Sequence, residues 1–107
     1  MTDSMYSKIY DKVSHIPHGR VTSYGEIARA VGMRSGAQVV GWALRILPAT
    51  TDIPWQRVVN KKGQISIVNP ALTKTLQKTL LEKEGVTITE KEGWYTVDRK
   101  YWWQPSM

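Results

Sequence analysis

The sequence has no cysteine among its 107 residues. A chain without cysteine has no disulfide framework, no thiolate metal site and no thiol nucleophile. His15 and His18 flank a proline turn without a carboxylate at ligand spacing. We therefore expect no metal site, no cofactor and no catalytic residue of these kinds.

Long apolar runs are also lacking, since no run approaches the roughly 20 residues needed to cross a bilayer. The amino terminus lacks the basic start and apolar stretch of a secretory signal. We expect a soluble protein without a membrane partner, either cytoplasmic (nucleoid-associated) or nuclear according to the organism. The length and the 41% hydrophobic content predict one domain over residues 1–107.

Positive charge is abundant and unevenly placed. The formal net charge is +6 and the pI is about 9.7. Between His15 and Lys62, seven basic residues stand against two acidic ones, whereas the flanks are nearly balanced, with eight against seven. This charge favours an anionic partner such as nucleic acid, although small soluble proteins are often basic without a specific reason.

Two short helices are predicted in the basic half of the chain. Ser23 and Glu26 match a capping box, and Gly32 is a natural helix end. Ser35 and Gln38 form a second box, which opens a helix predicted to run to about Leu47. Two helices joined by such a turn suggest a helix-turn-helix, although generic core helices share this pattern.

The second of these helices has two distinct faces. Its predicted buried side carries apolar residues at helical spacing, namely Val40, Ala43, Leu44 and Leu47. Its opposite face carries Arg34, Gln38, Gly41 and Arg45. Long donors around a glycine would allow the backbone to approach a partner closely.

The flanking elements are less distinctive. An amino-terminal helix capped by Asp3 or Ser4 would bury Met5, Ile9, Val13 and Ile16. A turn is predicted at 60–63, a last helix from Pro70 to Glu84 that Gly85 ends, and a tail with a short strand or an extended aromatic segment. The expected fold is mainly α with a small β element, a helix-turn-helix (winged-helix-like) DNA-binding domain.

Three segments in register, 19–28, 36–41 and 53–60, resemble the carboxyl-terminal domain of the alkylguanine-DNA alkyltransferases. In those enzymes the third segment reads Pro-Cys-His-Arg-Val. Here Trp55 stands at the acceptor cysteine and Gln56 at the histidine that activates it, while Glu84 matches the glutamate of the relay. Because nucleophile and base are both missing, we predict that the protein is not an enzyme.

Tryptophan at the cysteine position is the mark of the alkyltransferase-like proteins. This resemblance implies minor-groove binding of double-stranded DNA containing O6-alkylguanine, with the alkylated base flipped into a pocket and no alkyl transfer. It also implies that nucleotide excision repair proteins take over the lesion. With no dimerisation element in the sequence, we expect a monomer.

The same resemblance, with the helix faces above, assigns the site residues. DNA binding is predicted for Ser23, Tyr24, Arg34, Ser35, Ala37, Gln38, Gly41 and Arg45. Tyr24 would help turn the nucleotide outward, and Gln38 stands where the family has an intercalating arginine. The lesion pocket, with Trp55 as an aromatic wall, is predicted from Tyr24, Trp55, Gln56, Arg57, Ile65, Ser66 and Val68.

Two alternatives stay open at this point. One is a helix-turn-helix transcriptional regulator that binds a specific site in the major groove. Such a regulator has no need for the 54–57 segment and commonly has a dimerisation element. The other is a degenerate domain with only a protein partner, suggested by Gln38 in place of arginine.

Overall fold

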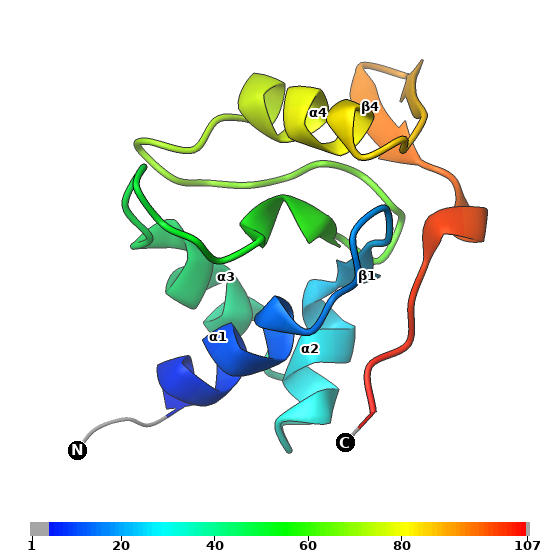
Figure 1. Ribbon diagram of the computed structural model, residues 1–107. Helices are drawn as coiled ribbons and strands as arrows, with labels where there is room; N and C mark the ends of the chain where they lie inside the picture. The colour runs from blue at the N-terminus through cyan, green and yellow to red at the C-terminus, as the bar shows by residue number, and fades with distance from the viewer. Residues whose placement is uncertain (1–4, 107) are drawn as a thin grey trace.

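The computed structural model describes residues 5–106 and is mainly helical, as predicted (Figure 1). Three helices form one layer: α1 (Met5–Ser14), α2 (Tyr24–Ala30) and α3 (Ala37–Arg45). The fourth, α4 (Lys74–Lys83), lies on the other side of the molecule beside a hairpin of β3 (Ile88–Lys91) and β4 (Trp94–Val97). Between the layers lies a short 3-10 helix, η1 (Trp55–Arg57).

Two small sheets make up the β element. Strand β1 (Thr22–Ser23) pairs in parallel with β2 (Val58–Val59), so the start of α2 is fastened to the end of η1. Strands β3 and β4 pair antiparallel, with Ile88 opposite Val97. A last 3-10 helix, η2 (Arg99–Tyr101), follows, and Trp102 and Trp103 after it are partly buried. The tail thus contains the predicted short strand.

The larger core cluster joins α1, α2, α3 and η1. The predicted buried face of α3 is confirmed, because Val40, Ala43 and Leu44 are fully buried and Leu47 is 7% exposed. On α1 and just beyond it, Ile9, Val13 and Ile16 are buried and Met5 is partly buried, as predicted. The predicted caps Asp3 and Ser4 lie outside the described residues.

A second core cluster lies under α4 and the hairpin, and its buried members are Val21, Val59, Ile65, Leu81, Val86 and Val97. Gln77 of α4 is fully buried and ties the layers together. Its Nε2 donates to the carbonyl oxygens of Gln56 at 3.0 Å and Val58 at 2.9 Å. Helix α4 therefore holds η1 and β2 in place through the side chain of Gln77 as well as by packing.

The two predicted capping boxes differ in outcome. Oγ of Ser23 accepts the backbone N–H of Glu26 at 3.1 Å, which confirms Ser23 as the N-cap, whereas the Glu26 carboxylate accepts from Arg29 at 2.8 Å. The box at Ser35 is wrong, because α3 begins at Ala37 and its N-cap is Gly36, without a side-chain hydrogen bond. Gly36 has φ −98° and ψ 10° instead of the extended backbone of a capping serine, and Met33 fills the space of its missing Cβ.

The start of the last helix also differs from the prediction. Helix α4 begins at Lys74, and Oγ1 of its N-cap Thr73 accepts the N–H of Leu76 at 3.1 Å. The preceding residues from Pro70 form a turn instead, in which Oδ1 of Asn69 accepts the backbone N–H groups of Ala71 and Leu72. The predicted turn at 60–63 is confirmed by a 2.8 Å hydrogen bond from Gly63 N to Asn60 O.

The described residues contain neither a membrane-spanning helix nor a cluster of metal-ligating side chains. No helix in this part of the chain is long and apolar enough to cross a membrane. Within residues 5–106, no group of three or more histidine, aspartate or glutamate side chains is placed to hold a metal ion.

Candidate nucleic-acid interface

The outer face of α3 is the most open helical surface of the basic half of the chain. Ala37, Gln38, Trp42 and Arg45 are exposed on it, and Gly41 is half-buried. A Cβ added at Gly41 would meet no atom within 4 Å, so no other part of the described chain covers the helix backbone there. This face is free to approach a partner at backbone distance.

A cavity of about 420 Å³ opens beside this face, and we call it the α3 cavity. Its lining comes from α2, from α3 and from the loop that follows β2: Tyr24, Ala37, Gln38, Gly41, Trp42, Arg45, Ser66 and Val68. Its volume lies in the range of small-molecule pockets. A partner seated on α3 therefore meets the mouth of the cavity directly.

Asn69 fastens the loop side of the cavity to α3. Its Nδ2 donates to the carbonyl oxygens of Leu44 at 2.8 Å and Leu47 at 3.0 Å, which lie at the end of the helix. Its Oδ1 accepts the backbone N–H groups of Ala71 and Leu72. One side chain thus satisfies free carbonyls at a helix terminus and fixes the loop that carries Ser66 and Val68.

Tyr24 forms the α2 side of the cavity. It follows the N-cap Ser23 and packs partly against the core. Burial raises the pKa of the Tyr24 phenol, and the side chain of Ser66 lowers it in part. The phenol is therefore neutral at physiological pH and remains able to donate a hydrogen bond.

The α3 cavity has a positively charged side chain at its edge, that of Arg45. Arg45 lines it and is exposed, and within residues 5–106 no carboxylate lies at ion-pair distance from Arg45. Arg29, by contrast, is bonded to Glu26 at 2.8 Å on α2. An unpaired guanidinium beside an open helix face suits an anionic partner such as a phosphate group.

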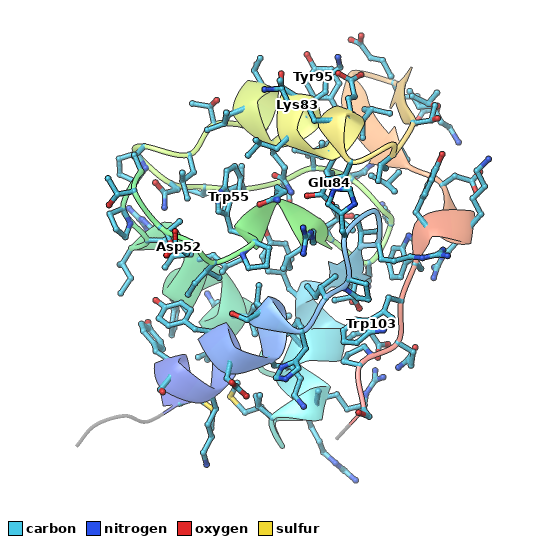
Figure 2. All side chains as sticks on the ribbon, viewed as in Figure 1. Asp52, Trp55, Lys83, Glu84, Tyr95 and Trp103 are labelled. Carbon is cyan, nitrogen blue, oxygen red and sulfur yellow. The ribbon has the colours of Figure 1, made fainter. Side chains whose placement is uncertain are left out.

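The 54–57 segment lies deeper in the molecule. Trp55 is 4% exposed and belongs to the larger core cluster, and Figure 2 shows it with Glu84 between α4 and the other helices. The segment lines a second cavity of about 430 Å³, the η1 cavity, together with Leu72, Leu76 and Leu80. Trp55 is thus a core residue that borders a different cavity from Tyr24.

Glu84 is the hub of the polar contacts around η1. Its carboxylate accepts the N–H of Gly19 at 2.8 Å, Nε2 of Gln56 at 2.7 Å and Nε of Arg57 at 3.0 Å. Arg57 also donates to the carbonyl oxygen of Ile16 at 2.7 Å. Burial acts to raise the pKa of Glu84, but the hydrogen bonds from Gly19, Arg57 and Gln56 outweigh it and lower the pKa. The carboxylate is ionised and fully engaged.

The structure thus distributes the predicted lesion-pocket residues over three places. Tyr24, Ser66 and Val68 meet in the α3 cavity. The residues Trp55, Gln56 and Arg57 line the η1 cavity, and Ile65 is 1% exposed within the second core cluster.

Five of the eight predicted DNA-binding residues line the α3 cavity, namely Tyr24, Ala37, Gln38, Gly41 and Arg45. Arg34 and Ser35 are exposed in the turn before α3, and Ser23 is buried as a helix cap. Sequence reasoning missed Trp42, although its spacing of four from Gln38 and three from Arg45 places it on the same helix face.

The paired helices α2 and α3, the open outer face of α3 and the adjoining cavity together define a helix-turn-helix DNA-binding domain. Residues 4–86 match the family described as "6-O-methylguanine DNA methyltransferase, DNA binding domain". The chain belongs to this family.

Its relatives include alkyltransferase-like and base-flipping proteins as well as methyltransferases. The chain is 45% identical to Alkyltransferase-like protein 1 of Schizosaccharomyces pombe, over 96% of this chain and 97% of that protein. It is 41% identical to the DNA base-flipping protein of Vibrio parahaemolyticus, over 96% of this chain and 99% of that protein. The solved structure of S. pombe Atl1 with damaged DNA containing O6-carboxymethylguanine superposes with a TM-score of 0.90 at 44% identity, covering 98% of this chain and 99% of that one.

Proposed function

We propose that the protein binds O6-alkylguanine in duplex DNA, rotates the damaged base into the α3 cavity and leaves the alkyl group in place. The main support is that the α3 cavity opens directly beside the exposed outer face of α3. A helix seated in the minor groove would therefore bring a rotated nucleotide to Tyr24. The Atl1 complex with O6-carboxymethylguanine DNA and the base-flipping relatives support this assignment.

The energetics of the proposal rest on a few contacts. Rotating a base out of the stack costs a few kcal/mol, and less where the lesion already weakens pairing. Gly41 allows the helix backbone to come close to the groove, and Arg45 carries charge for a phosphate contact. Tyr24 and Val68 then offer the rotated base a partly apolar surface in place of its stacking neighbours.

The side chains around η1 support the proposed absence of alkyl transfer. No thiol is available in the sequence, and Trp55 is a buried indole of very low nucleophilicity. Gln56 donates through its amide and has no useful basicity. The Glu84 carboxylate is held by three N–H donors near the η1 cavity and does not line the α3 cavity. The protein therefore acts by binding.

A paired titration tests this function. Fluorescence anisotropy is measured on a duplex with one O6-methylguanine and on the matched guanine duplex at one salt concentration, because affinity depends steeply on salt. We expect about tenfold tighter binding to the lesion, a difference of about 1.4 kcal/mol. Intact-mass measurement of the recovered protein should show no added methyl group. Equal affinities, or a methylated protein, would contradict the proposal.

A lesion that is bound but not repaired must be removed by other proteins. We therefore propose that the complex, with the protein as a monomer on one lesion, is passed to nucleotide excision repair. Sedimentation of the protein–duplex complex checks the one-to-one stoichiometry. Incision of a lesion plasmid by purified excision-repair proteins should increase when the protein is added. Unchanged incision would separate lesion binding from any role in repair.

A further inference from the structure

Four of the five tryptophans have partners inside the protein. Trp55 lies in the larger core cluster, Trp103 packs against it, and Trp102 packs against the second cluster. Trp94 lies beneath a lysine ammonium group at 5.4 Å from the ring centroid. Trp42 differs, because it is 48% exposed and belongs to neither core cluster of the described residues. An indole left in this state on a helix is a candidate binding surface.

The position of Trp42 says what it would contact. It lies one helical turn after Gln38 on the outer face of α3, and it lines the α3 cavity. Val68, which is 66% exposed, lines the same cavity from the loop held by Asn69. An aromatic ring and a branched apolar side chain, carried by different segments, thus share one opening.

Among the aromatic side chains near the α3 cavity, Trp42 is the most exposed to solvent. Tyr24 is half-buried and packs partly against the core. Trp55, which the sequence suggested as the aromatic wall, is 4% exposed and borders the η1 cavity instead. A planar ligand that enters the α3 cavity therefore finds its accessible aromatic face at Trp42.

We propose that Trp42 is a lesion-contacting residue whose indole packs on the rotated guanine and its O6 substituent at the cavity mouth. This inference rests on the proposed function, because it requires a base to enter the α3 cavity. Nucleobases stack on aromatic side chains, and this stacking does not depend on the hydrogen-bonding groups of the base. An apolar substituent on the base adds contact area against the same aromatic ring. Trp42 therefore contributes to the difference between damaged and undamaged DNA, with a larger contribution for larger apolar O6 groups.

The test compares Trp42→Ala and Trp42→Phe with the control Trp94→Ala. Trp94 is also a half-exposed tryptophan, 38% exposed, but it lies on β4 and does not line the α3 cavity. Each variant is titrated with duplexes that contain guanine, O6-methylguanine or O6-benzylguanine. Circular dichroism and urea unfolding confirm that the variants are folded.

We expect Trp42→Ala to weaken binding of the O6-benzylguanine duplex about tenfold or more, in the range of one lost base–aromatic stack. The loss should be smaller for O6-methylguanine and smallest for guanine. Trp42→Phe should retain most of the binding, and Trp94→Ala should bind like wild type. An equal loss on all three duplexes would make Trp42 a general groove contact and overturn the proposal, as would no loss at all.

A spectroscopic readout separates contact from an indirect effect. In protein labelled with 5-fluorotryptophan, the ¹⁹F signal of Trp42 is assigned from the Trp42→Phe variant. It should shift with the lesion duplexes much more than with the guanine duplex, while the Trp94 signal stays in place. If wild type itself does not distinguish the duplexes, the proposed function fails. If wild type distinguishes them and Trp42→Ala does so equally well, the role of Trp42 alone fails.

Discussion

Nε2 of Gln56 donates a 2.7 Å hydrogen bond to Oε2 of Glu84. Glutamine at this position keeps a donor on the carboxylate but has no nitrogen that can accept a proton. The carboxylate is held at the same time by Arg57, whose side chain is 16% exposed against 7% for Glu84. The pair therefore fastens η1 to the end of α4, which is a structural role.

Replacing Glu84 by glutamine should destabilise the fold at neutral pH by about 3 kcal/mol, because the largely buried Arg57 loses its counter-charge. The pKa of Glu84 is lowered in the folded state, so its stabilisation is complete above the unfolded pKa of about 4.3 and is lost as the pH falls through the folded pKa. Urea unfolding should therefore show the gap between wild type and Glu84→Gln narrowing in acid.

Glu82→Gln is the matched control for this prediction. Glu82 lies on the same helix and pairs with Lys78 at 3.1 Å, but its side chain is 45% exposed. An exposed pair of this kind contributes little, so the control should lose less than about 1 kcal/mol. A gap between wild type and Glu84→Gln that stays constant through the acid range would show that ionised Glu84 does not carry this stability.

Gly41→Ala should separate folding from binding. The added Cβ meets no atom within 4 Å, and alanine in a helix interior is favoured over glycine by up to about 1 kcal/mol. The variant should therefore melt at the same temperature as wild type or higher. Its affinity for duplex DNA should nevertheless fall several-fold, because the methyl group keeps the helix backbone from the groove. Unchanged affinity would mean that α3 does not approach DNA at Gly41.

Gln38→Arg should strengthen DNA binding. Gln38 is exposed beside the α3 cavity, and arginine there adds a charge for phosphate and a planar surface for the gap left by a rotated base. The lesion duplex should gain more than the guanine duplex, with a steeper dependence on salt for both. Thr75→Arg adds the same charge on α4, away from the α3 cavity. It should raise the affinity for both duplexes weakly and to the same extent. Equal gains from both variants would argue against a specific place for residue 38 in the complex.

Gly63→Ala tests the turn before the loop of the α3 cavity. Gly63 has φ +81°, and a Cβ there would lie 2.6 Å from the carbonyl oxygen of Val97. Gly93 has a similar φ of +84°, but its Cβ would meet nothing within 4 Å. Both alanine variants carry the cost of about 1–2 kcal/mol for left-handed backbone. Only Gly63→Ala must also move Val97, so it should be clearly the less stable of the two in urea unfolding.

Local signals in the sequence predicted those parts of the fold that local contacts decide. The cap at Ser23 and the buried face of α3 follow from spacing within one helix, and both are confirmed. The turn over residues 69–72 depends on Asn69, whose amide reaches carbonyls about 25 residues earlier in the chain, and no local pattern reveals that. The cap of α4 at Thr73 is a local signal that was open to prediction.

The candidate site divides in the same way. Gln38, Gly41 and Arg45 are found on the predicted helix face, and Trp42 shares their spacing and was open to prediction. The placement of Tyr24 and Trp55 in different cavities was not open to prediction, because the two cavities are lined by segments that only the packing of the whole chain brings together.

Selective binding of the lesion is measured by the ratio of two dissociation constants. It is measured for wild-type protein at one salt concentration, with an O6-methylguanine duplex and its matched guanine duplex. We predict about tenfold tighter binding of the lesion duplex, with the methyl group still on the DNA when the complex is recovered. A ratio of one, or a methyl group found on the protein, would contradict it.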